Sequence, residues 1–385
     1  MRNNAVLCVF IHLLLLVTLS YTVLSPVAFA AQENTLESRA SCTQQTSQPP
    51  PSSQSYRESG DNEDLTTPPS TEVPTPITLG LFIEEIPAIN ELENTFTIEG
   101  RMSITWCDLR LQHGGSGEEN IDTFLEEKAQ EKIRSIWWPD ITFANEVAKR
   151  DIANEALFIH GNGTVEYREK FSVTLEGKYD LSKFPFDKQT LQIEMASFAW
   201  DVRYLKILID TQRTGFSDEF ELPEWHTSQI TNDIKEFMEV ESPAPFSKLV
   251  IMIDVTRQFG FYLWKVLLPL ISLVLICFAI FWMSNDSLAD RMSISFTGVL
   301  TVVAYQFIAT GSLPKVPYIT LMDVYINFSF IIMIATILQS IVISSYQNSD
   351  KNERARHIDK SSRWLFPIAY FGGLGVLTLV FTTMQ

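Results

Sequence analysis

The sequence predicts an extracellular, all-β, immunoglobulin-like sandwich fused to a transmembrane bundle of four helices. Two observations predict this fold. Residues 76–257 alternate between polar and apolar side chains in short runs, and residues 258–385 contain four long apolar segments. Alternation with a period of two is typical of strands that bury one face. An apolar segment of about 20 residues is long enough to cross a bilayer as a helix.

The first 75 residues divide into a secretory signal and a polar leader. Residues 1–30 combine a basic start, an apolar run and the small-residue motif Ala28-Phe29-Ala30, which is typical of a cleaved signal peptide. Residues 31–75 are rich in Ser, Thr, Gln, Pro and acidic residues, so we expect them to be disordered. The mature chain is therefore expected to begin outside the cytoplasm.

The sandwich is predicted from several short strands separated by turn residues. Clear examples of alternation are 96–106, 164–175 and 191–195, and a Gly-Asn-Gly cluster ends at Gly163. The stretch 121–135 has a helical pattern and is expected to interrupt the strands. The last strand, 249–257, runs into the first apolar segment without a linker, so movement of the sandwich should be passed to the helices.

The four apolar segments predict spans at about 261–283, 287–309, 319–346 and 364–382. The segment 347–363, between the third and fourth spans, is rich in Lys and Arg and is expected to be a short cytoplasmic loop. Because basic connections stay on the cytoplasmic side, both chain termini are predicted to lie outside. The loop is too short for a cytoplasmic output domain.

Composition argues against several classes of protein. The net charge of −17 argues against nucleic-acid binding. The sequence contains no catalytic, phosphate-binding or metal-binding motif, so we expect neither an enzyme nor a cofactor. Cys42 lies in the leader and Cys107 in the sandwich, and the sequence leaves open whether they pair.

The second span carries a stripe of residues unlike an ordinary lipid-facing helix. At helical spacing the stripe begins with hydroxyls and becomes apolar, and Asp290 precedes it; its members are Ser293, Thr297, Leu300, Ala304 and Phe307. Polar groups inside a membrane usually face a water-filled cavity, because lipid cannot satisfy them. The alternative is that the hydroxyls bond to the backbone of their own helix.

Five motifs in order resemble the pentameric ligand-gated ion channels, the superfamily of the nicotinic receptors. They are Trp106-x-Asp108-x-Arg110-Leu111, Trp137-Trp138-Pro139-Asp140, Phe184-Pro185-Phe186-Asp187 with Gln189, Pro269, and Leu313-Pro314-Lys315-x-Pro317-Tyr318. The loop cysteines of animal members are replaced by Gly177 and Leu191, and the large cytoplasmic loop is missing. The chain therefore resembles the bacterial members, and its pore helix resembles that of the amine-gated type. The resemblance implies a homopentamer in a bacterial inner membrane, contacting lipid.

The resemblance also implies roles for the stripe. Five Asp290 side chains would form a ring that selects monovalent cations, with Ser293 and Thr297 beside it. Leu300, Ala304 and Phe307 would form an apolar gate that closes by excluding water.

For ligand binding and coupling the resemblance implies two further sets of residues. A small-molecule agonist would bind between subunits at Arg101, Phe143, Ala144, Tyr167, Phe198, Phe237 and Phe246. Binding would be coupled to the pore through Glu91, Phe186, Asp187, Arg257, Pro314, Lys315 and Tyr318. Ala144 and Ala196 stand where an aromatic residue and an acid would hold an amine, and Arg101 favours an anion. The agonist is thus left open among an amine, another small ligand and a proton.

Two alternatives to a ligand-gated cation channel remain at this stage. The acidic residues Asp218, Glu219 and Glu221 suggest modulation by protons or divalent ions, although they form no firm metal site. The second alternative is a membrane-anchored binding module that does not conduct. The polar stripe favours the channel, because an anchor needs no such face.

Overall fold

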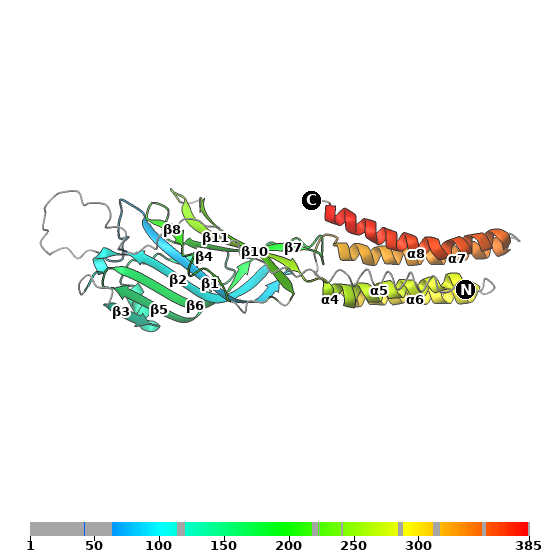
Figure 1. The fold of residues 1–385 in the computed structure, drawn as a ribbon, viewed down its shortest axis with the longest axis horizontal. Helices are drawn as coiled ribbons and strands as arrows, with labels where there is room; N and C mark the ends of the chain where they lie inside the picture. The colour runs from blue at the N-terminus through cyan, green and yellow to red at the C-terminus, as the bar shows by residue number, and fades with distance from the viewer. Residues whose placement is uncertain are drawn as a thin grey trace. The chain divides into compact units, whose positions relative to one another are not determined.

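A computed structural model describes residue 42 and residues 64–113, 120–217, 222, 224–239, 242–283, 288–310, 316–348 and 352–383. Some predictions lie outside these residues: the signal peptide 1–30, Asp218, Glu219, Glu221, Pro314 and Lys315. Within the described residues, the predicted sandwich and the predicted four membrane-spanning helices are both present (Figure 1).

Seven of the described strands form one sheet, in the order β3-β5-β6-β2-β1-β8, with β9 paired to β1. Their bounds are β1 Thr75–Asn90, β2 Thr95–Cys107, β3 Ile121–Leu125, β5 Asp151–His160, β6 Thr164–Glu176, β8 Leu205–Ile209 and β9 Gly215–Phe216. A short 3-10 helix, η2 Leu109–Leu111, follows β2. The β3-β5-β6-β2-β1 pairings are antiparallel, whereas β8 and β9 run parallel to β1.

The second sheet is ordered β10-β11-β7-β4. Its strands are β4 Ile141–Phe143, β7 Lys188–Ser197, β10 Trp225–Phe237 and β11 Phe246–Arg257. The pairing brings the β10–β11 hairpin tip close to the end of β7, since Phe237 is opposite Phe246 and Lys248 is opposite Ala196. The loop that follows β7 therefore lies near the hairpin, on the side where β4 begins.

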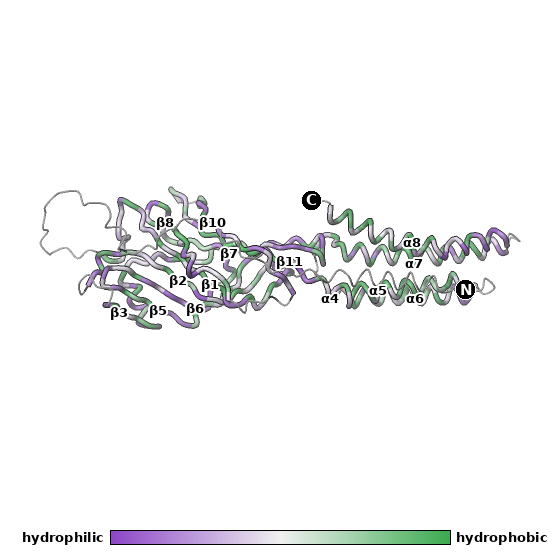
Figure 2. Tube along the Cα trace, in the orientation of Figure 1, coloured by the Kyte–Doolittle hydropathy of each residue, from purple (hydrophilic) through white to green (hydrophobic). Residues whose placement is uncertain are grey.

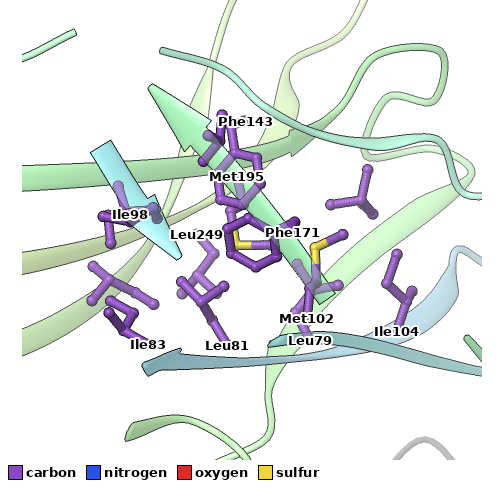
Figure 3. Close-up of a cluster of buried hydrophobic side chains, with 14 of the residues drawn as sticks. Leu79, Leu81, Ile83, Ile98, Met102, Ile104, Phe143, Phe171, Met195 and Leu249 are labelled. Carbon is purple, nitrogen blue, oxygen red and sulfur yellow. The ribbon is translucent and has the colours of Figure 1, made fainter. Parts of the chain in front are cut away.

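The two sheets enclose one apolar core. Side chains of both sheets meet there, including Leu81, Ile98, Met195 and Leu249 (Figure 3). Phe143 of one sheet and Phe171 of the other have ring centroids 5.1 Å apart. Burying one such side chain stabilises a fold by about 1.5–3 kcal/mol, so this core is a main source of the stability of the domain.

The helical region follows β11 directly. The first span comprises α4 Gly260–Tyr262, a π-helical segment η3 Leu263–Leu267, α5 Leu268–Phe278 and a 3-10 turn η4 Ala279–Trp282. The other spans are α6 Leu288–Thr310, α7 Leu321–Asn348 and α8 Asn352–Thr383. Apolar residues dominate α5 and α7, whereas the first turns of α8 are hydrophilic (Figure 2).

The prediction of one helix over 121–135 is wrong for its first part. Residues Ile121–Leu125 form β3, which pairs with β5, and the helix α3 covers only Glu127–Ile133. Glu126 separates the two with a positive φ of 49°. An available strand edge beside a run containing Ile, Thr and Phe explains the difference.

The prediction of a loop over 347–363 is also wrong for most of its length. Helix α8 begins at Asn352, so the basic segment continues the fourth span. No Gly or Pro interrupts residues 352–363, and Arg363 lies 3.4 Å from Asp359 one turn earlier. Basic residues that predicted a cytoplasmic connection by their charge are equally good helix formers.

The predicted disorder of the leader does not extend to its last residues. Residues 64–74 form turns, and Arg110 donates to the carbonyl oxygens of Asp64 and Thr67 at 3.3 and 2.8 Å. The pairing that the sequence left open is present, because Cys42 and Cys107 form a disulfide. A polar segment without a core of its own is thus fastened to the sandwich.

Candidate functional site

The stripe predicted on the second span faces away from the other helices of this chain. On α6 the six predicted residues are all exposed: Asp290, Ser293, Thr297, Leu300, Ala304 and Phe307. Leu300 and Phe307 are 70% and 78% exposed, whereas Val302 on the opposite side is fully buried. The helix therefore packs through one face and leaves the stripe uncovered.

The hydroxyl of the stripe residue Thr297, and that of Thr301 one turn later, bond to their own helix. Thr297 donates to the carbonyl oxygen of Ser293 at 2.8 Å, and Thr301 donates to that of Thr297 at 2.7 Å. This is the alternative that the sequence had left open, and it is compatible with a cavity-facing role. Each hydroxyl oxygen keeps lone pairs that can accept from water or contact a cation.

Two contacts fix the packed face of α6 against the first span. Pro269 lacks the N–H that would bond to the Lys265 carbonyl, and the hydroxyl of Tyr305 donates to the neighbouring Val266 carbonyl at 2.6 Å. At Gly298 an added Cβ would collide with the sulfur of Cys277. Only glycine allows α6 to approach α5 this closely.

Three of the predicted coupling residues, Glu91, Asp187 and Arg257, meet in one cluster. Arg257, at the end of β11, contacts Asp187 through two bonds of 2.8 and 3.1 Å and contacts Glu91 at 2.8 Å. The rings of Trp225 and Phe184 lie 4.1 and 4.9 Å from the guanidinium carbon. Burial opposes the charge of Arg257, but hydrogen bonds and charge from Asp187 and Glu91 outweigh burial, so the pKa of Arg257 is raised.

The same cluster continues to the helices. Phe186, in the loop before β7, packs on Phe259 with ring centroids 5.1 Å apart. The hydroxyl of Tyr318 accepts from the Leu181 amide at 3.0 Å, and the Leu321 amide donates to the Ser182 carbonyl at 3.0 Å. The loop carrying Asp187 thus contacts both the first span and the start of α7.

One part of the predicted ligand site is a charged concavity on the exposed face of the larger sheet. Its volume is about 560 Å³, and four cationic side chains line it: Arg101, Arg168, Lys170 and Arg213. Glu84 lies 2.7 Å from Arg101 and 2.8 Å from Lys170. Glu166 pairs with Arg168 and Arg213, and Asp210 lies 3.9 Å from Arg213.

Two carboxylates that pair with the lining cations, Glu84 and Glu166, are held in the charged form. Hydrogen bonding from Lys170, with a further bond from Arg101, lowers the pKa of Glu84. Burial of Glu166 opposes its charge, but Arg168 and Arg213 outweigh burial and lower its pKa. The concavity is therefore a network of ion pairs rather than an aromatic box.

The other part lies on the smaller sheet, near the β10–β11 hairpin. Ala144 and Phe198 are exposed, and Phe198 is 77% accessible. Phe237 lies over Phe246 with centroids 5.8 Å apart. The ammonium of Lys248 lies 5.0 Å from the Phe237 ring and 2.7 Å from Glu194. An aromatic ring and an acid that could hold an amine ligand already hold a lysine of this chain.

Comparison with known proteins agrees with this arrangement. Residues 60–260 match the neurotransmitter-gated ion-channel ligand binding domain, and residues 266–353 match the neurotransmitter-gated ion-channel transmembrane region. The chain belongs to this family of ligand-gated ion channels. Membership confirms the resemblance to the pentameric superfamily and makes the chain a multi-pass membrane protein.

The relatives of this channel include bacterial and animal proteins. The chain is 25% identical over 328 residues to a proton-gated ion channel of Gloeobacter violaceus. The aligned part covers 83% of this chain and 87% of the relative. The chain is 26% identical over 276 residues to gamma-aminobutyric acid receptor subunit theta of Mus musculus, covering 70% of this chain. The chain spans 42% of the mouse subunit and 55% of a similar Drosophila melanogaster subunit.

Three predicted ligand residues of this channel need correction. Phe143 and Tyr167 are 1% and 2% exposed and lie in the core, and Phe246 is 6% exposed beneath Phe237. Strand alternation explains the first two, because each is one residue away from an outward-facing position. Ala144 and Arg168 are the exposed neighbours.

Tyr167 instead belongs to a buried polar network. Its hydroxyl lies 2.9 Å from a carboxylate oxygen of both Glu155 and Glu169, which are directly opposite each other on β5 and β6. Arg150 lies 2.7 Å from the second oxygen of Glu169. Burial raises the pKa of Glu169, and Glu155 raises it further, while Arg150 and Tyr167 oppose the rise.

Several residues of the site were missed by the sequence prediction. Arg168, Lys170 and Arg213 join Arg101 only because β6 and the segment after β8 lie beside β2 and β1. Lys248 on β11 is directly opposite Ala196 of β7, and Glu194 lies two residues before Ala196 on β7. The alternation that places Ala196 on the outer face could have identified Glu194, but no signal in the chain relates residues of distant strands.

Proposed function

We propose that five copies of this chain assemble into a cation-selective channel with α6 around the pore. The observation that carries the proposal is the uncovered stripe of α6. A helix surrounded by lipid has no use for an acidic and hydroxylated face, whereas a pore requires one. In the assembly, Asp290 forms a ring that attracts monovalent cations, and Leu300, Ala304 and Phe307 form an apolar constriction.

The agonist that fits the extracellular domain is a small polar molecule with an anionic group. Arg101 is paired with Glu84 at 2.7 Å, but its side chain stays 65% exposed, so it can still reach a ligand, and it lines a concavity with three further cations. A guanidinium binds a carboxylate through two parallel hydrogen bonds. An amine is favoured less, because Lys248 occupies the acid and the ring that would bind it. A proton is the second candidate, supported by the buried network around Tyr167.

The membrane arrangement follows from the same proposal. The sandwich and both termini lie outside the cytoplasm, and the basic first turns of α8 lie on the cytoplasmic side of a bacterial inner membrane. A membrane-anchored module that does not conduct would need no uncovered polar stripe.

Electrical recording tests the proposal. Purified protein in planar bilayers is exposed, at fixed pH, to amines, amino acids and dicarboxylates, and separately to pH steps. We expect cation current with a carboxylate-bearing ligand, and a loss of about tenfold or more in apparent affinity in Arg101→Ala, since a charged hydrogen bond contributes ~1.5–3 kcal/mol. Arg134→Ala, an exposed arginine outside the concavity, is the control. Equal responses in both variants would exclude this ligand site.

A further inference from the structure

The inner end of the pore helix contains a buried cation that the predicted roles do not use. Arg291 is the second residue after the exposed Ala289 and follows Asp290 directly, yet it is 1% exposed. Taking a guanidinium out of water is costly unless it is paired and hydrogen-bonded. Its surroundings therefore indicate what it does.

Arg291 joins three helices at one place. Its Nη2 lies 2.6 Å from a carboxylate oxygen of Asp359 on α8 and 2.9 Å from the Ile280 carbonyl in η4. Asp359 is itself 3% exposed. Arg363 donates to the Phe281 carbonyl at 2.8 Å and lies 3.4 Å from the other oxygen of Asp359. The last carbonyls of the first span are thus bonded by two arginines that share one acid.

These contacts fix the rotation of α6 about its own axis. Neighbouring residues on a helix are separated by about 100°. When Arg291 points into the bundle, Asp290 is turned away from it, and Ser293 and Thr297 follow on the same exposed side. Of the contacts that set this rotation, those of Arg291 lie nearest to Asp290. Breaking them should therefore let Asp290 turn.

We propose that the Arg291–Asp359 pair positions Asp290 at the pore mouth, so that a residue of α8 controls ion selectivity. Asp359 acts through Arg291 and does not itself touch the permeant ion. The effect on selectivity rests on the proposed function of Asp290 in the pore. The effect on the orientation of α6 does not, and it is measured separately.

The electrical test uses a cycle of two substitutions. Asp359→Asn keeps the shape of the side chain but removes its charge, and reversal potentials are measured under a salt gradient. We expect loss of most of the cation preference in Asp359→Asn, retention in Asp359→Glu, and no further loss when Asp359→Asn is added to Asp290→Asn. Glu353→Gln, an exposed acid in the first turn of α8, is the matched control and should behave as the parent. A merely structural pair would lower the amount of channel without moving the reversal potential.

A thiol-accessibility measurement is independent of selectivity. Ser293→Cys is treated with a membrane-impermeant thiol reagent, and the parent, whose free Cys277 is buried, is the blank. We expect the modification rate to fall several-fold when Asp359→Asn is added and to stay unchanged with Glu353→Gln. An unchanged rate together with a parental reversal potential would overturn the proposal. If Asp290→Asn alone changed nothing, the selectivity role would fail and the thiol rate would still decide.

A variant that fails to assemble is replaced by a milder one. Arg363→Gln removes the bond to the Phe281 carbonyl and one contact of Asp359 but leaves Arg291 paired. It should produce smaller changes in the same direction in both measurements. Parental values in both would overturn the proposal.

Discussion

The guanidinium of Arg257 contacts two carboxylates and two aromatic rings, although its side chain is only 1% exposed. Each partner comes from a different part of the chain: Glu91 follows β1, Asp187 precedes β7, and Arg257 precedes the first span. Because Arg257 bonds to both other segments, movement of any one of the three changes the contacts of the others. This is the residue-scale basis for coupling the sandwich to the helices.

Removing that charge should separate binding from opening. Arg257→Ala leaves Asp187 and Glu91 facing each other, and loss of one partner of a buried pair costs about 3–5 kcal/mol. We expect channels that bind agonist and open poorly, measured as a smaller maximal current per channel at the surface. Arg203→Ala, at a half-exposed arginine paired with Asp201, is the control. Normal opening of Arg257→Ala at every agonist concentration would contradict a coupling role.

A second residue-scale prediction concerns pH. The pKa of Glu169 is raised in the folded state, first by burial and then by Glu155. A group with a raised folded pKa contributes stability below its unfolded value, near 4.3, and loses it as pH rises through the folded value. Glu155→Gln removes the neighbouring negative charge that raises the pKa of Glu169. It should therefore reduce the loss of stability with rising pH, which is at most ~1.4 kcal/mol per pH unit for one proton.

The measurement is the apparent melting temperature of the full chain in detergent at a series of pH values. The difference between Glu155→Gln and the parent should shift in favour of the variant as pH rises above about 4.3. Glu127→Gln, an exposed acid at the start of α3, should run parallel to the parent. A parallel curve for Glu155→Gln would show that the network binds no extra proton.

At the scale of elements, the sequence predicted best where one periodicity dominates. Four spans and an alternating β-domain follow from apolar length and period two, and both are confirmed. The first part of 121–135 was mispredicted because its conformation depends on pairing with the edge of β5. The segment 352–363 was mispredicted because its basic charge indicates a side of the membrane and not a conformation. In the site, the stripe of α6 could be predicted because its residues lie within one helix. The ion pairs of Arg101 and Arg291 could not be predicted because they join segments far apart in the sequence.

The proposed gate belongs to α6 as an element. Leu300 lies on the uncovered stripe, so replacing it changes the pore surface and not the packing within one chain. Leu300→Thr should make a water-filled pore less costly, since an apolar constriction closes by excluding water. We expect spontaneous opening or activation at lower agonist concentration, recorded from matched amounts of surface protein. Ile308→Thr, also exposed on α6 but outside the stripe, is the control; equal effects from both would argue against a gate at Leu300.

At the scale of the whole molecule, the sandwich and the helices are joined by direct contacts as well as by the chain itself. The core of the sandwich, the Arg257 cluster and the bonds to Tyr318 and Leu321 form a continuous path to α7. Rotation of packed units about such an interface is a common form of two-state switching. The assembly proposed here would therefore open by concerted movement of five chains, with one acidic ring serving all of them.

That ring gives the prediction that concerns the assembled channel. Each copy contributes one Asp290, so Asp290→Asn removes the charge from every position of the ring at once. We expect the reversal potential under a salt gradient to move toward that of an unselective pore, because charged rings select ions by sign. Asp290→Glu keeps the charge and should keep the cation preference. If Asp290→Asn conducts with the reversal potential of the parent, cations are selected elsewhere, and the exposed hydroxyls of Ser293 and Thr297 become the next positions to substitute.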